Sequence, residues 1–245
     1  MVAGLPDWPN AGYTVPARGE KDRVIAALKQ LGKAKSVDAA MAVSGVLRRG
    51  GSPEVLEEAL KAAGKLKEEA SSTSIAPYLR HRNDSIRREA AKAIVKTKGK
   101  AAVDALRLAL RSGDAVVRGT AASGLGALGA KEALDDLFTA FDHRVAEAAG
   151  SIGQVCDKDK CADFASRLGK MQFDVMTSGF DQILFRPADQ IGDDEKIRVI
   201  GQLRELGTAE VSKYLADVSE RWPAGWSARV KQAIDAGTKA TKGSQ

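Results

Sequence analysis

The chain has 245 residues, of which 44% are hydrophobic and only 5% aromatic, and its formal net charge is +6 at pH 7. This composition favours closely stacked helices over a large aromatic-rich pocket, and the positive charge favours an acidic partner without choosing one. The sequence has no apolar run of about 18 residues, so we expect no transmembrane helix. No signal peptide opens the chain as given, although a leader could have been removed.

Residues 1–19 contain three Pro and three Gly together with Trp8 and Tyr13, and they show no helical period. We predict an extended N-terminal arm that packs one of these two aromatic residues against the first repeat, or else a loose tail.

From residue 20 onward, apolar residues recur at helical spacing in runs separated by Gly, Ser, Pro or Asp. Most runs come in pairs, which predicts an all-α chain of antiparallel helix pairs. A lone amphipathic helix within residues 170–191, a terminal helix at 227–236 and a C-terminal tail at 237–245 complete the prediction. The pairs are expected at residues 20–49, 53–82, 83–110, 114–141, 142–168 and 193–221.

The clearest pattern is a unit that occurs twice between residues 83 and 141. Moving residues 86–91 forward by 31 positions places them on residues 117–122, so that apolar falls on apolar, Arg on Arg and paired Ala on paired Ala. Asp84 and Asp114 stand where a helix N-cap is expected. One pair of helices cannot bury its apolar faces alone, whereas stacked pairs can, so residues 20–236 are predicted to form a single α-solenoid.

The pattern of Asp, Val/Ile-Arg, paired Ala and Leu-Gly in residues 114–129 resembles the short bacterial HEAT-like repeat, which also occurs in phycobilin-lyase-type proteins. The resemblance is strong over 114–137, good over 84–110 and weaker elsewhere. It implies a superhelix whose second (B) helices line a concave side, and it is nearly silent on activity. In that family the position of Arg87 and Arg118 usually ties neighbouring repeats to an Asp.

The two cysteines, Cys156 and Cys161, flank one predicted tight turn between two helices. Their Cα atoms can then approach the roughly 4.4–6.8 Å that a disulfide needs. The alternative is two unrelated thiols, one of them in the core. A disulfide, together with a removed leader, would favour the periplasm or cell envelope over the cytoplasm.

Motifs for catalysis and cofactors are weak. The spacing of the cysteines does not fit a metal site, and we expect none. We interpret His81 and His143 as solvated loop residues. The glycines of residues 124–129 mimic a dinucleotide-binding motif, but they lie inside a predicted helix and follow no strand, so close helix packing explains them better. We therefore expect no enzyme activity, no cofactor and no small-molecule substrate.

Charge is unevenly distributed along the chain. Residues 80–118 contain 11 Lys and Arg against 4 Asp and Glu, a local charge of +7 that exceeds that of the whole chain. A solvated basic face is one interpretation. The other is a partner-binding surface on the B helices, made by Arg80, Lys100, Arg107 and Arg111.

Three functions follow from these observations. The first is a non-enzymatic scaffold that binds another protein, with an acidic surface, through a partly basic concave face. The second is nucleic-acid binding, as in HEAT-like alkylpurine DNA glycosylases, although no aromatic residues alternate with the basic ones to stack on bases. The third is a phycobilin-lyase-like chaperone or enzyme, which the resemblance permits and no residue demands.

Overall fold

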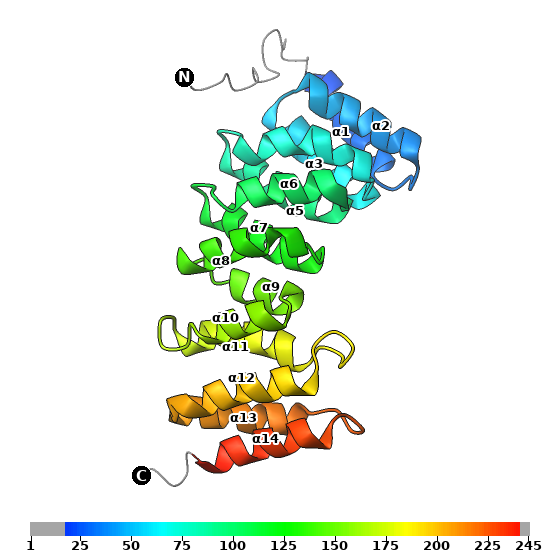
Figure 1. Ribbon diagram of the computed structural model, residues 1–245. Coiled ribbons are helices and arrows are strands. Elements are labelled where there is room, and N and C mark those ends of the chain that lie inside the picture. Colours follow the sequence, from blue (N-terminus) through cyan, green and yellow to red (C-terminus); the bar gives the residue numbers. More distant parts are fainter. Residues whose placement is uncertain (1–17, 241–245) are drawn as a thin grey trace. The chain divides into compact units, whose positions relative to one another are not determined.

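The computed structural model describes residues 18–240, and all regular structure in this range is helical (Figure 1). The predicted all-α fold of stacked helix pairs is therefore confirmed. The predicted N-terminal arm lies outside the described residues except for its last two positions, which open the first helix.

The chain divides into two compact units, Met1–Gly124 and Leu125–Gln245, and the boundary falls within one helix, α7. The prediction of a single array did not foresee this division. Unit 1 contains α1 (Arg18–Leu31), α2 (Val37–Arg49), α3 (Pro53–Leu66), η1 (Glu69–Ser71), α4 (Ser72–Ile75), η2 (Ala76–Arg80), α5 (Asp84–Thr97), α6 (Gly99–Ala109) and most of α7 (Ala115–Ala127).

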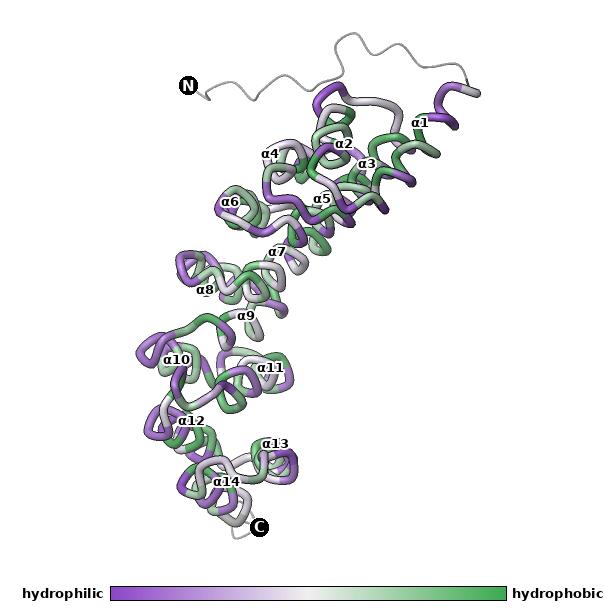
Figure 2. The backbone as a smooth tube through the Cα atoms, turned by 90° about the vertical axis from the view of Figure 1, so that its right-hand side faces the viewer, coloured by the Kyte–Doolittle hydropathy of each residue, from purple (hydrophilic) through white to green (hydrophobic). Residues whose placement is uncertain are grey.

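In unit 1 the first helices of successive repeats pack against one another, α1 on α3 and α3 on α5. The second elements form the other side, where α2 packs on α4, and η2 on α6. Hydrophilic and hydrophobic residues alternate along the turns of the helices (Figure 2), and most of the hydrophobic ones in unit 1 are buried. Leu60, Ile94 and Leu106 are completely buried between the two sides. Burial of these hydrophobic residues is the main force holding the repeats together.

The second element of the repeat at 53–82 is broken into η1, α4 and η2 instead of forming one helix. Pro77 stands in the first turn of η2, and it has no amide hydrogen to continue the α4 helix. Two buried hydroxyls hold the broken segment in place. Ser71 Oγ accepts from Ser44 Oγ at 3.3 Å, and Ser72 Oγ lies 2.7 Å from Thr97 Oγ1.

The glycines of α7 allow close helix packing, as predicted. A Cβ atom on Gly124 would lie 2.4 Å from Cγ2 of Val95, within unit 1. A Cβ atom on Gly126 would lie 2.4 Å from Oε1 of Gln154, within unit 2. Gly129 has φ +65° in the turn that follows, a conformation that favours glycine.

Unit 2 has a more aromatic core, in which the rings of Phe141, Phe164 and Phe180 follow one another at centroid distances of 5.5 and 5.2 Å. The lone helix predicted within 170–191 is α11. Besides the end of α7, the unit contains η3 (Lys131–Ala133), α8 (Leu134–Asp142), α9 (Ala148–Val155), α10 (Lys158–Ala165), α11 (Phe173–Leu184), α12 (Asp193–Leu206), α13 (Ala209–Arg221) and α14 (Ala228–Ala240).

The last helix is longer than predicted. α14 packs on α12 and α13 and continues to Ala240, so Gly237 lies inside it and does not begin a tail. A Cβ atom on Gly237 would lie 2.5 Å from Cδ1 of Leu215. The glycine therefore marks close packing here, although in the sequence it looked like a helix end.

Candidate protein-binding surface

The four predicted partner-binding residues belong to neighbouring B elements of unit 1. Arg80 ends η2 and is exposed, and the other three lie on or just after α6, against which η2 packs. Lys100 Nζ forms an exposed ion pair with Asp104 Oδ2 at 2.8 Å, one turn along the same helix. Such a pair contributes little and can be exchanged for a partner's carboxylate. The role of these residues stays a prediction.

Sequence reasoning missed Arg49, which ends α2 and is exposed. Moving Arg80 back by 31 residues gives Arg49, just as moving it forward gives Arg111. The signal was present, but the first repeat matches the motif too weakly for its Arg to be noticed. Each of the three successive B elements of unit 1 therefore has an arginine at its end or, for α6, two residues after it.

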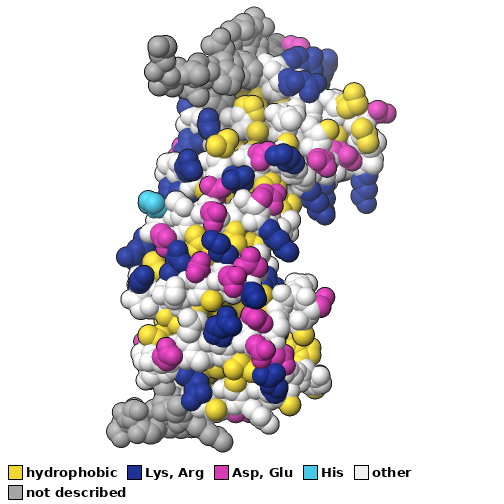
Figure 3. Space-filling view, in the orientation of Figure 1, with side chains coloured by type: hydrophobic (Ala, Val, Ile, Leu, Met, Phe, Trp, Pro, Cys, Tyr) yellow, Lys and Arg dark blue, Asp and Glu magenta, His cyan; other side chains and the backbone are white. Residues whose placement is uncertain are grey.

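The two units differ in charge. Unit 1 holds 22 Lys and Arg against 13 Asp and Glu, a net charge of +9, whereas unit 2 holds 16 against 19, a net charge of −3. On the face drawn in Figure 3, dark-blue side chains stand among magenta ones and form no continuous field. Which basic residues can receive a partner therefore depends on which are already neutralised within the fold.

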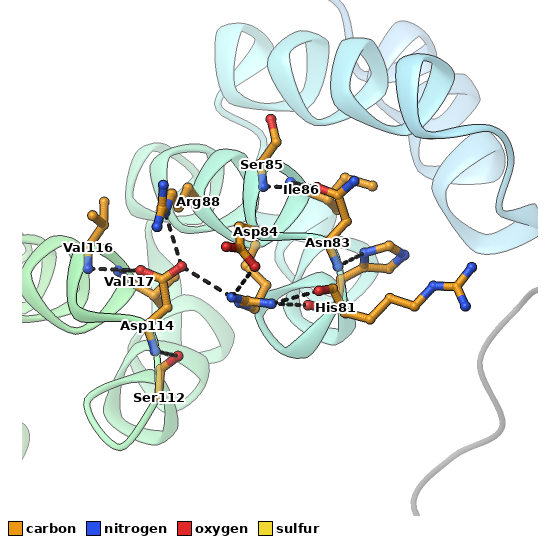
Figure 4. Close-up of polar contacts among 12 residues, drawn as sticks. His81, Asn83, Asp84, Ser85, Ile86, Arg88, Ser112, Asp114, Val116 and Val117 are labelled. Carbon is orange, nitrogen blue, oxygen red and sulfur yellow. Dashed lines mark hydrogen bonds and ion pairs between the residues drawn. The ribbon is translucent and has the colours of Figure 1, made fainter.

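Asp114 neutralises much of the charge on the first-helix side of unit 1 (Figure 4). Its Oδ2 accepts from Nε of Arg88 at 3.0 Å and from Nη2 of Arg87 at 3.3 Å. Its Oδ1 accepts from the backbone amides of Val116 at 2.9 Å and Val117 at 3.4 Å. One buried carboxylate thus caps α7 and binds two arginines of the preceding repeat.

Burial by itself would raise the pKa of the Asp114 carboxyl group, but the hydrogen bond from Arg88 and those from the two backbone amides outweigh it. The pKa of Asp114 therefore lies below its ordinary value, and the group is ionised at neutral pH.

The expected cap at Asp84 was wrong by one position. The side chain of Asn83 caps α5, because its Oδ1 accepts from the amides of Ser85 at 2.9 Å and Ile86 at 3.4 Å. Asn83 is 31 residues before Asp114, so the caps of α5 and α7 are repeat-equivalent (Figure 4). Asp84 lies in the first turn of the helix and pairs with Arg87 at 2.6 Å.

The recurring arginine is structural in both copies, in agreement with the implication of the family resemblance for Arg87. Arg87 Nη1 donates to the main-chain O of His81 at 2.8 Å, and Arg118 Nη1 donates to that of Ser112 at 2.7 Å. Both bonds span six residues and tie the helix to the loop before it. Within residues 18–240, Arg118 forms no hydrogen bond or ion pair with an Asp side chain.

The two histidines differ from each other. His143 is exposed as predicted, but His81 is buried, because its ring packs 6.0 Å from the ring of Tyr78. The amide of Asn83 donates to Nδ1 of His81 at 3.1 Å, which requires that nitrogen to be unprotonated. Burial and the charges of two neighbouring arginines lower the pKa of His81. The imidazole is thus a neutral packing group.

In unit 2 the structure joins Cys156 and Cys161 in a disulfide, with a Cα–Cα distance of 5.3 Å. The predicted disulfide is thus present in the structure, where it closes the turn between α9 and α10. Arg186, two residues after the end of α11, reinforces that turn. Its Nη1 donates to the main-chain O of Gln154 and its Nη2 to that of Cys156, both at 2.6 Å.

A pocket of about 450 Å³ opens beside the disulfide. Its net charge is near zero, so it offers no electrostatic preference for an anion or a cation. The charged side chains lining it are Lys131, Lys158, Arg186, Asp157, Asp189 and Glu195. Within residues 18–240, no group of three or more His, Cys, Asp or Glu side chains could hold a metal ion. None of the helices in that range is long and apolar enough to cross a membrane.

The geometry defines a helical-repeat protein with a basic unit of three repeats and a second, slightly acidic unit. Residues 72–152 match the family model described as HEAT repeats, so this part of the chain consists of HEAT repeats. This segment contains both copies of the unit at residues 83–141.

Several solved structures are similar to the chain, and three of them follow. The complex of CpcE and CpcF of phycocyanin lyase from Nostoc sp. PCC7120 is 16% identical, with 98% of this chain and 100% of that chain covered and a TM-score of 0.47. An engineered protein is 15% identical, with 91% and 90% covered and a TM-score of 0.40. A designed armadillo repeat protein is 14% identical, with 93% and 96% covered and a TM-score of 0.41. At these values the likenesses carry no argument about activity. No curated protein matches the sequence.

Proposed function

We propose that this HEAT-repeat protein is a non-enzymatic scaffold that binds another protein through the B-element side of unit 1. The partner presents an acidic surface to Arg80, Lys100, Arg107 and Arg111. One observation carries the proposal. The conspicuous arginines on the first-helix side are committed to Asp114 and to main-chain carbonyl groups, whereas Arg80 is exposed and forms no hydrogen bond or ion pair with residues 18–240.

Nucleic acid is a less suitable partner for this surface. Single-stranded nucleic acid is bound without sequence preference mainly by basic grooves that also provide aromatic rings for base stacking. In the described part of unit 1 the aromatic residue is Tyr78, which is buried. A nucleic acid would therefore find basic side chains for its phosphates here, but no exposed aromatic ring on which its bases could stack.

The test is a binding experiment with two matched charge-reversal variants. In the first, Arg80, Arg107 and Arg111 are replaced by Glu. In the second, Lys65, Lys92 and Lys96 are replaced by Glu; these are exposed residues of α3 and α5, so the total charge changes equally. Helical content of both variants is checked by circular dichroism.

We expect proteins captured by the wild type to be retained by the second variant and lost by the first. Equal loss in both would show that binding follows net charge alone and would refute the assigned surface. Retention of random DNA by the wild type with a steep salt dependence would favour the nucleic-acid alternative.

A further inference from the structure

The three B elements of unit 1 end with the same backbone arrangement. The amide of Gly50 donates to Leu47 O at 3.2 Å, that of His81 to Tyr78 O at 3.1 Å, and that of Ser112 to Ala109 O at 3.0 Å. These donors are 31 residues apart, and so are the acceptors. The residue before each donor is an arginine, so the backbone presents Arg49, Arg80 and Arg111 in equivalent positions.

Successive ends lie side by side. Tyr78 Oη donates to the main-chain O of Leu47 at 2.5 Å, and these two residues occupy the same position in consecutive repeats. Arg48 Nη1 also donates to Ser74 Oγ at 3.4 Å across the same junction. The next junction is formed by the packing of η2 on α6. The step between repeats is therefore about one helix-packing distance, roughly 8–10 Å.

An apolar residue accompanies each arginine, three positions earlier and so on the same side of its element. The residues are Val46, Pro77 and Leu108. Val46 is half-buried, Pro77 is exposed and Leu108 is 58% exposed, an unusual exposure for a leucine. We name these six residues the arginine track; its members are Val46, Arg49, Pro77, Arg80, Leu108 and Arg111.

The arginine track stops at the end of unit 1. Another shift of 31 residues gives Thr139 and Asp142, so the apolar position becomes polar and the basic position becomes acidic. Asp142 is bound within unit 2 by Nε of Arg167 at 3.0 Å. The pattern thus spans three repeats and changes sign where the net charge of the units changes.

The spacing points to the conformation of the ligand. In a polyproline II helix three residues make one turn with a rise of about 3.1 Å each, so every third side chain lies on one face, about 9 Å from the last. This matches the step between repeats. In a β-strand, side chains three residues apart point to opposite faces and cannot both reach the track.

Building on the proposed function, we propose that the arginine track binds an extended acidic segment of another protein in the polyproline II conformation. One carboxylate in every three residues pairs with an arginine, and the intervening proline or aliphatic side chains pack on the apolar members. Arg49 and Arg80 carry the contact, because neither side chain forms a hydrogen bond or ion pair within residues 18–240.

The experiment uses the full chain and two synthetic peptides of identical composition. One repeats Glu-Pro-Pro four times; the other places its four Glu residues together at one end, followed by eight Pro. Binding is followed by fluorescence anisotropy at low and moderate salt. We expect the evenly spaced peptide to bind at least about tenfold more tightly. Equal affinities would overturn the proposal that carboxylates three residues apart pair with successive arginines.

Two double variants locate the contact. Arg49→Glu with Arg80→Glu should abolish the preference for even spacing, whereas Lys65→Glu with Lys96→Glu, which makes the same change of charge on the other side of unit 1, should preserve it. Preservation in the first variant would overturn the assignment of the track. If captured proteins still depend on Arg80, Arg107 and Arg111 while both peptides bind equally, the scaffold function stands and the polyproline II inference alone fails.

Discussion

Arg88 Nε lies 3.0 Å from Oδ2 of Asp114, the carboxylate that caps the first helix of the next repeat. The Asp114 side chain thus caps the start of α7 and links two neighbouring repeats. Because its side chain is only 2% exposed, its partners depend on it more than those of a surface carboxylate would.

The first prediction concerns Asp114→Ala. The substitution removes a helix cap and leaves two arginines without their shared carboxylate, so we expect the free energy of unfolding to fall by about 3 kcal/mol. Asp84→Ala is the control, because that side chain is 63% exposed and should cost less than about 1 kcal/mol. Urea denaturation measures both, and similar losses would contradict the assigned role.

The second prediction is a pH dependence. The folded-state pKa of Asp114 lies below its unfolded value, so its contribution is fully present above that unfolded value, about 3.9. The contribution is lost as pH falls through the folded-state pKa. The difference in unfolding free energy between wild type and Asp114→Asn should therefore shrink below about pH 4. A difference that stays constant down to pH 2.5 would show that ionisation of this group does not matter.

Tyr78→Phe is the third prediction. Loss of the bond to Leu47 O leaves that carbonyl group with the bond from the amide of Gly50 alone, and it should cost about 1 kcal/mol at pH 7. Burial raises the pKa of Tyr78 to about 12, above the unfolded value near 10. Wild-type stability contributed by this group is thus present below pH 10 and lost as pH rises from about 10 to 12. The variant should lack this part of the alkaline loss, measured by chemical denaturation at several pH values.

The fourth prediction compares two glycines. Gly124→Ala places a Cβ atom 2.4 Å from Val95 and should cost about 1–3 kcal/mol, partly offset by the higher helix propensity of Ala. Gly113→Ala meets nothing within 4 Å and should change stability by less than about 0.5 kcal/mol. Thermal unfolding distinguishes them. If Gly124→Ala is no worse than its control, the helices do not pack as closely as described.

The fifth prediction concerns the disulfide. The native protein purified without reductant should show no reactive thiol, and Cys156→Ser with Cys161→Ser should lower stability by about 2 kcal/mol, the chain-entropy value for so short a loop. Adding reductant should destabilise the wild type and leave the double variant unchanged. Two titratable thiols in the untreated native protein would refute the bond.

The sequence by itself determined the helix pairs, the period of 31 residues and the proximity of Cys156 and Cys161. These features depend on contacts within one repeat, where helical spacing and turn residues fix which positions meet. The same locality limited the prediction of caps, because Asp84 and Asn83 are adjacent and both residue types are good caps.

Only the tertiary structure decided which charged side chains are paired with other groups of the protein. That Arg88 binds Asp114 while Arg80 stays available depends on the side-chain directions across the junction between repeats, and helical spacing does not encode them. The burial of His81 and the division into two units have the same origin. A repeat sequence specifies what each helix buries, but the fit between neighbouring repeats specifies what each leaves exposed.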